Sequence, residues 1–152
     1  MPAIGVSARV ISLGGSPTGG LAVPSLADVF DTGWYKFTAL PGTAGNSVIA
    51  GHVDTYRGPA VFYNLYLLRP GEPIYVGIGA HNRQQYTVRW VKEVPKADFP
   101  MAEVFGRTTA HRLWLITCGG SFDYATRHYL DNIIVAAGQP APRSAARQRR
   151  QP

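Results

Sequence analysis

The sequence has a single cysteine, Cys118, among its 152 residues. One thiol cannot form a disulfide within the chain, and it cannot supply the cysteine ligands of a structural zinc site. Cys118 ends an apolar run, LWLITC, and two glycines follow it directly. A cysteine that only packs in a core does not need two glycines directly after its strand. This position therefore favours a catalytic nucleophile, with room beside the thiol for a substrate backbone.

Long hydrophobic runs are also missing. No apolar stretch approaches the roughly 20 residues that a membrane-spanning helix needs. The first ten residues, MPAIGVSARV, lack the basic and apolar segments of a signal peptide. Hydrophobic residues make up 45% and charged residues 16% of the chain, which is typical of a folded globule of one domain.

The positive charge is unevenly distributed. The formal net charge is +6, but four of the 15 basic residues and no acidic residue lie after Gly138, which leaves 11 basic residues against 9 acidic ones. No basic stripe interleaved with aromatic residues runs through the rest, so we expect no nucleic-acid partner. We predict a folded domain over 1–138 and a disordered basic tail over 139–152, either solvated or attracted to an anionic membrane or wall polymer.

Short runs of β-branched and aromatic residues, cut by glycine and proline, predict an all-β fold. Helical segments are expected only as short connections, after Ser25, within 58–70 and over 98–106. About seven or eight short strands with so little helix indicate a closed or nearly closed β-barrel. The clearest strands are expected at 4–13, 48–55, 74–79, 84–94, 112–118 and 128–137.

A thiol attacks as the thiolate, which a nearby cation stabilises. His52 follows an apolar run as Cys118 does, so the two can meet at one rim of a barrel; alternatively, His52 is a rim histidine bonded to backbone. His128, on the next predicted strand, is a second candidate. Arg127, nine residues after Cys118, has donors that suit an oxyanion, although a lone arginine is more often a surface charge. Asp54 could orient His52 or simply cap a turn.

The segments that carry these residues resemble a bacterial sortase, most closely the class F enzymes of actinobacteria. The resemblance extends from about Ile4 to Ala137 and is carried by NSVIAGHVDT, GPAVFYNLYLLRPGEPIYV, LWLITCGGSFD and HYLDNIIVAA. It implies a closed eight-stranded β-barrel with short helices in the connections, formed by a sortase catalytic domain over 1–138.

The resemblance also implies a cysteine transpeptidase. Such enzymes cleave a Leu-Pro-any-Thr-Gly (LPXTG) sorting signal after Thr through a thioacyl intermediate, and they pass the acyl group to an amine. On the matching positions, Cys118 is the nucleophile, His52 is the acid and base, and Arg127 positions the substrate and stabilises the oxyanion. Thr117 and the backbone N–H of Gly119 are expected to bind the substrate beside the thiol.

One position departs from part of the family. Some members carry the arginine nearer position 130, where this chain has Leu130. Walls for the Leu-Pro part of the signal are expected from 39–45 and 61–66. No cofactor and no metal are expected.

The implied partners are surface proteins with a C-terminal sorting signal and a peptidoglycan precursor or another amine acceptor. The implied location is the outer face of the cell membrane, held there by an N-terminal anchor that this chain lacks, so that the chain is a soluble portion. The alternative function is a non-catalytic β-barrel binding module that contacts an acidic polymer, with Cys118 as a packing thiol.

Overall fold

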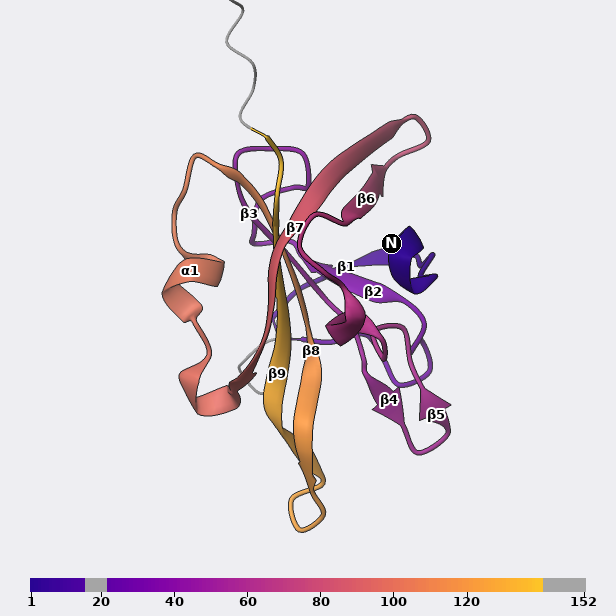
Figure 1. Cartoon of the computed structure of the whole chain (residues 1–152). Coiled ribbons are helices and arrows are strands. Elements are labelled where there is room, and N and C mark those ends of the chain that lie inside the picture. The colour runs from indigo at the N-terminus through magenta and orange to yellow at the C-terminus, as the bar shows by residue number, and fades with distance from the viewer. Residues whose placement is uncertain (16–21, 141–152) are drawn as a thin grey trace, which may run out of the picture.

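The computed structural model describes residues 1–15 and 22–140, and the predicted tail from 141 onward lies outside them. Seven strands form one sheet in the order β1-β2-β3-β8-β9-β7-β6. Figure 1 shows the long strands β7, β8 and β9 running the length of the molecule. The strands of this sheet are β1 (Val10–Leu13), β2 (Thr32–Tyr35), β3 (Gly45–Ala50), β6 (Pro73–Ile78), β7 (Asn82–Pro95), β8 (His111–Asp123) and β9 (His128–Gly138).

The remaining elements are short. A separate two-stranded ladder joins β4 (Asp54–Thr55) and β5 (Gly58–Pro59). Three 3-10 turns, η1 (Pro2–Ile4), η2 (Leu65–Leu67) and η3 (Lys96–Asp98), and one helix, α1 (Met101–Phe105), complete the described residues. The prediction of a mainly β fold with short helical connections is confirmed.

Several element bounds differ from the prediction. The helix expected within 58–70 is reduced to η2, because Pro70 disfavours helical backbone just before it and Leu68 is already extended. No helix follows Ser25; its hydroxyl accepts a hydrogen bond from the N–H of Ala27 and closes a turn. Strand β2 was not predicted, because four residues that include Gly33 give too little alternation to recognise.

The sheet curls into an open half-barrel, and closure into an eight-stranded barrel is not confirmed. Strands β1 and β6 are its two edges, and no ladder joins them in the described residues. The N-terminal segment lies in the gap instead: η1 contacts β6, and Met1, Ile4 and Val6 pack against the inner core. Figure 1 shows the N-terminus beside β1 and β6. Apolar side chains of this N-terminal segment thus lie against the edge strands β1 and β6, which would pair with each other in a closed barrel.

Apolar side chains cover both faces of β8, which explains its unbroken hydrophobic run. Leu113 and Leu115 belong to the inner core with Phe62, whereas Trp114 and Ile116 belong to an outer core together with residues of β3, β9 and α1. Successive side chains of a strand alternate between its faces. At the end of the run, therefore, the side chain of residue 117 belongs to the inner face and that of residue 118 to the outer face.

Candidate active site

The register of β3 and β8 brings His52 and Cys118 to the same level. These strands are parallel, and each pair, up to Ala50 and Ile116, is 66 residues apart in sequence. The N–H of Gly51 donates to the carbonyl of Ile116 at 3.1 Å, so the pattern continues beyond Ala50. His52 and Cys118 have the same offset, and alternation directs both side chains to the outer face. Both are half-buried.

Thr117 fastens the ends of the two strands to each other. Its hydroxyl donates to the carbonyl of Gly51 at 2.7 Å, and its side chain is buried. Its own carbonyl accepts from Nδ2 of Asn132 at 3.2 Å, and Asn132 is the residue that pairs with Cys118. Thr117, the residue before the thiol, is therefore linked to β3 through Gly51 and to β9 through Asn132. Sequence analysis did not identify Asn132 as part of the site, because one amide in a strand has no distinctive pattern.

The ring of His52 is anchored to backbone. Its Nε2 lies 2.6 Å from the carbonyl oxygen of Pro24. A carbonyl only accepts, so Nε2 carries the proton in this contact. Nδ1 has no hydrogen-bond partner among the described residues and is the nitrogen available to a reacting group. The backbone bond considered in the sequence analysis is thus present, and it fixes the tautomer of the ring.

The structure does not bring Arg127 to the thiol. Strands β8 and β9 stay paired as far as Asp123 and His128, and Arg127 lies in the turn beyond them with a left-handed φ of 57°. Its N–H donates to the carbonyl of Asp123 at 2.7 Å, and its side chain is exposed. Asp123 lies five residues after Cys118 along β8, which corresponds to a distance of roughly 16 Å. Figure 1 shows this hairpin projecting from the body.

An apolar side chain lies on the same face of β9 as the partner of Cys118. Asn132 lies opposite Cys118, and Leu130 precedes it by two residues, toward the hairpin turn, on the same face by alternation. Leu130 is 52% exposed. This face of the hairpin therefore presents a hydrophobic side chain beside the thiol, where some relatives are expected to have the arginine.

The two glycines after Cys118 shape the hairpin. A bulge sets Gly120 and its successor against a single residue of β9, and Gly120 has a φ of 73°. A Cβ on Gly119 would lie 2.7 Å from Cγ1 of Ile133, and one on Gly120 would overlap the carboxylate of Asp131. The close packing of β8 on β9 thus requires both glycines. The sequence suggested a different reason for these glycines, the space that a substrate backbone needs.

A pocket of about 280 Å³ adjoins the thiol on the inner side of the sheet. The hydroxyl of Tyr129 donates to Oδ2 of Asp54 at 2.5 Å, and this hydrogen bond, with burial, raises the pKa of Tyr129 to about 12. A hydrogen bond with Asp131 raises the pKa of Glu93. The lining residues are Val53, Asp54, Phe62, Tyr63, Tyr66, Glu93, Thr117, Cys118, Gly119, Gly120, Tyr129 and Ile133.

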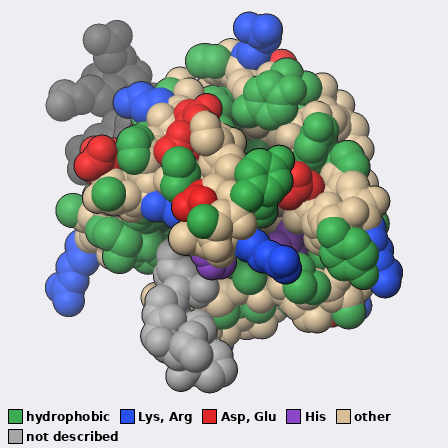
Figure 2. Space-filling model, turned by 90° about the horizontal axis from the view of Figure 1, so that it is seen from below, with side chains coloured by type: hydrophobic (Ala, Val, Ile, Leu, Met, Phe, Trp, Pro, Cys, Tyr) green, Lys and Arg blue, Asp and Glu red, His purple; other side chains and the backbone are tan. Residues whose placement is uncertain are grey.

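No basic side chain belongs to that lining, so the pocket favours a cation. Figure 2 looks at the end of the molecule from which the hairpin projects and shows acidic side chains set among hydrophobic ones over the middle of this face, with a basic side chain and histidine next to them. Carboxylates and tyrosine rings together are suited to an ammonium group.

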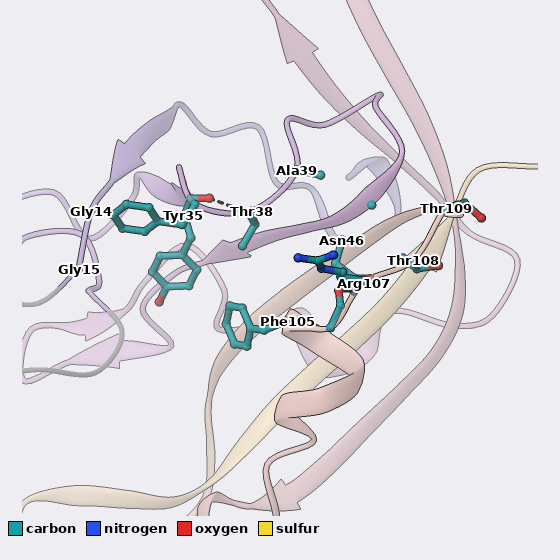
Figure 3. A pocket seen from close by; sticks show the side chains of 13 residues that line it. Gly14, Gly15, Tyr35, Thr38, Ala39, Asn46, Phe105, Arg107, Thr108 and Thr109 are labelled. Atoms are coloured by element: carbon teal, nitrogen blue, oxygen red, sulfur yellow. Dashed lines mark hydrogen bonds between the residues drawn. The ribbon is translucent and has the colours of Figure 1, made fainter.

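A larger pocket of about 830 Å³ lies on the outer side of the sheet. Figure 3 shows Tyr35 and Phe105 reaching into it from β2 and the end of α1; their ring centroids are 6.4 Å apart. Burial, and in second place the charge of Cys118, raise the pKa of Tyr35 to about 12. By register Tyr35 lies next to Trp34, which pairs with Ile49, so it is nearer the thiol end of the pocket than Asn46 and Gly45. The rest of the lining is Gly14, Gly15, Phe37, Thr38, Ala39, Gly45, Asn46, Gly106, Arg107, Thr108 and Thr109.

The two segments expected to wall one groove line separate pockets. Ala39 and Gly45 belong to the outer pocket, whereas Phe62, Tyr63 and Tyr66 belong to the inner one. The sheet lies between the two pockets, because β8, the strand that carries Cys118, has one pocket on each of its faces. This division could not be predicted from the sequence, because the topology of the fold decides which face of the sheet a loop covers.

Neither a metal site nor a membrane helix is found in the part of the chain that the structure describes. Within 1–15 and 22–140, no three side chains among His, Cys, Asp and Glu are grouped so as to hold a metal ion. None of the helices in these ranges has the length and apolar character to span a bilayer.

Comparison with known proteins identifies the family. The sortase domain profile matches residues 1–139. Sortase A from Corynebacterium diphtheriae is similar over 79% of this chain and 54% of its own, with 24% identity and a TM-score of 0.58. Sortase C-1 from Actinomyces oris is similar over 92% of this chain and 70% of its own, with 21% identity and a TM-score of 0.66.

A sortase C from Streptococcus pneumoniae is similar over 92% of this chain and 63% of its own, with 19% identity and a TM-score of 0.66. The chain thus spans about half to about seven-tenths of the length of these structures, and at such identities they bear on the fold. No curated protein matches the sequence. The profile match over nearly the whole described chain shows that this protein belongs to the sortase family.

Proposed function

We propose that this domain is a cysteine transpeptidase of class F type that cleaves an LPXTG-like signal after Thr and transfers the acyl group to an amine. The observation that carries the proposal is the common register of His52, just after β3, and Cys118, within the adjacent strand β8, in a chain of the sortase family. The class assignment rests on the sequence segments around these residues. The eight-stranded closure is part of the proposal and requires a pairing that bridges β1 and β6.

The chemistry follows from these two side chains. The Cys118 thiolate attacks the Thr carbonyl, and the N–H of Gly119 supports the oxyanion. When the thiolate forms, the thiol proton goes to Nδ1 of His52, because Nε2 already carries the proton bonded to the carbonyl of Pro24. As the peptide C–N bond breaks, this Nδ1 proton passes to the leaving amine, which leaves a thioester on Cys118. The incoming amine then forms a new C–N bond, its proton returns to His52, and the thiolate leaves.

The outer pocket suits the signal. It extends from Tyr35, whose neighbour Trp34 pairs with Ile49, to Gly45 at the start of β3, and Gly45 pairs with His111, seven residues before Cys118. Seven strand residues span about 23 Å, enough for the four residues Leu-Pro-any-Thr in extended form. Phe37 and Phe105 provide the apolar walls that Leu and Pro require.

We assign the amine acceptor to the inner pocket. Cys118 belongs to the lining of this pocket, so an amine whose ammonium group is held by the carboxylate of Asp54 lies beside the thioester, while the acyl chain occupies the outer face. We expect Asp54→Asn to lower the ratio of transfer to hydrolysis about fivefold, the equivalent of ~1 kcal/mol for one exposed charge pair. Product analysis by mass spectrometry at several amine concentrations measures this ratio.

Tyr129→Phe is the matched control for Asp54→Asn, because it removes the hydrogen bond to Asp54 and keeps the carboxylate. It should preserve the transfer ratio. Equal ratios in the wild type and Asp54→Asn would place the acceptor elsewhere.

Arg127 is proposed to position the substrate from the hairpin turn. Because it lies in the turn beyond Asp123, the last paired residue of β8, we expect Arg127→Gln to raise KM several-fold and to change kcat little. Steady-state kinetics with the signal peptide separates these constants. A loss of kcat as large as that of a His52 variant would instead show that the hairpin closes on the oxyanion during the reaction.

The proposed function is tested with a quenched fluorescent LPXTG peptide, with and without a glycine-type amine. Cleavage that yields the amine adduct, together with a thioacyl mass on Cys118, is the expected result. No cleavage and no acylation across signal variants would favour the binding module. We propose surface proteins with sorting signals and cell-wall amines as partners, and the outer face of the cell membrane as the location, on the family membership alone.

A further inference from the structure

Tyr35 is buried in the outer pocket without a partner for its hydroxyl. The residue is 4% exposed and lines the pocket, yet no described residue forms a hydrogen bond with its phenol. Ser47 Oγ is the one fully enclosed polar side-chain atom without a partner in 1–15 and 22–140, so the Tyr35 hydroxyl still opens onto the pocket. A buried polar group normally has a partner, and here the pocket is where a partner can bind.

The hydroxyl can act only as a neutral donor or acceptor at working pH. Burial and the nearby charge of Cys118 raise its pKa to about 12. Tyr35 follows Trp34, which pairs with Ile49 of β3, whereas Asn46 and Gly45 lie toward the start of β3. The phenol therefore belongs to the end of the pocket nearer the thiol, where the acyl group forms. A protonated phenol is a strong donor to a carbonyl oxygen.

The other polar groups on the sheet side of the pocket are already occupied. Nδ2 of Asn46 donates to the carbonyls of Glu103 and Gly106, and its Oδ1 accepts from Trp114. Thr38 Oγ1 donates to the carbonyl of Tyr35 at 2.6 Å, the dashed line in Figure 3, and accepts from the N–H of Val48.

The walls beside Tyr35 are apolar. Phe37 and Phe105 line the same pocket, so a peptide that enters it loses water from its backbone carbonyls. In a mostly apolar site, a few placed polar groups fix the orientation of the ligand. The Tyr35 hydroxyl is the free donor at the thiol end.

We propose that Tyr35 binds a backbone carbonyl of the sorting signal's acyl segment and thereby orients the Thr carbonyl toward Cys118. The inference rests on the proposed function and adds a specific substrate-binding residue to it. It requires a peptide bond at this position of the ligand, so a signal in which that amide is reduced to an amine should lose the contact.

Tyr35→Phe tests the proposal, with Tyr86→Phe as the matched control. The hydroxyl of Tyr86 accepts from the N–H of Gly42 at 2.7 Å within the protein, so its loss should lower the thermal unfolding temperature and leave kcat/KM unchanged. For Tyr35→Phe we expect kcat/KM for the LPXTG peptide to fall about tenfold, and the unfolding temperature to stay the same or rise.

Direct binding separates this inference from the proposed function. The affinity of the LPXTG peptide is measured by fluorescence anisotropy for Cys118→Ala and for Cys118→Ala with Tyr35→Phe. About tenfold weaker binding in the double variant supports the role of Tyr35, whether or not the wild type turns over. Equal affinities, no peptide binding, or a fall in stability with Tyr35→Phe equal to that of Tyr86→Phe would overturn it.

Discussion

Replacing Cys118 by alanine is expected to reduce cleavage of an LPXTG peptide to the background rate, a loss of at least about a thousandfold. The reason is that the chain has no second thiol to form a thioester. Mass spectrometry of the acylated enzyme and continuous fluorescence both measure the effect. Cys118 is half-buried within β8, at the end of its apolar run, so alanine fits the site and the thermal unfolding temperature should change little.

Thiol labelling provides a second measurement on the wild type. A catalytic Cys118 should be alkylated in the folded protein and protected by the bound signal peptide. Cleavage that persists in Cys118→Ala, or a thiol that reacts only after unfolding, would contradict the nucleophile assignment and support a packing role.

Replacing His52 by alanine is expected to reduce kcat by about 10²–10⁴-fold, the usual contribution of a general acid and base. Nδ1 is the free nitrogen of the ring, while Nε2 is held by the carbonyl of Pro24. His52→Gln separates these two roles, because an amide N–H can replace the hydrogen bond to Pro24 but cannot exchange a proton in the reaction. We expect His52→Gln to be as inactive as His52→Ala and more stable to heat.

His128→Ala is the control for His52, because His128 is exposed at the start of β9, next to the hairpin turn. Its kcat/KM should match that of the wild type. If His128→Ala lost activity and His52→Gln kept it, the acid–base role would pass to the hairpin, and the hairpin would have to fold over the thiol.

The pairing of His52 with Cys118 could be predicted because each follows an apolar strand, and strand ends meet at one rim of a curled sheet. The last four strands were predictable for the same reason: their runs are long and rich in β-branched residues. The family could be recognised because these local patterns occur in the right order along the chain.

The position of Arg127 could not be predicted, because a spacing of nine residues fits either a loop that folds back or a hairpin that extends outward. The bulge at Gly120 and the ladder up to Asp123 decide this. The partners of Asn46 and the surroundings of Tyr35 were equally hidden, because their contacts join residues that are distant in sequence.

By itself, the sequence determined the mainly β fold and the family, and it led to the proposal of Cys118 as nucleophile with His52, because strand periodicity and strand-end polarity are local properties of the chain. Tertiary structure alone decided that the sheet is open, that Arg127 lies away from the thiol, and that a pocket lies on each face beside Cys118. These features depend on strand order, on one bulge and on which loop covers which face, and such long-range packing leaves no periodic pattern in the sequence.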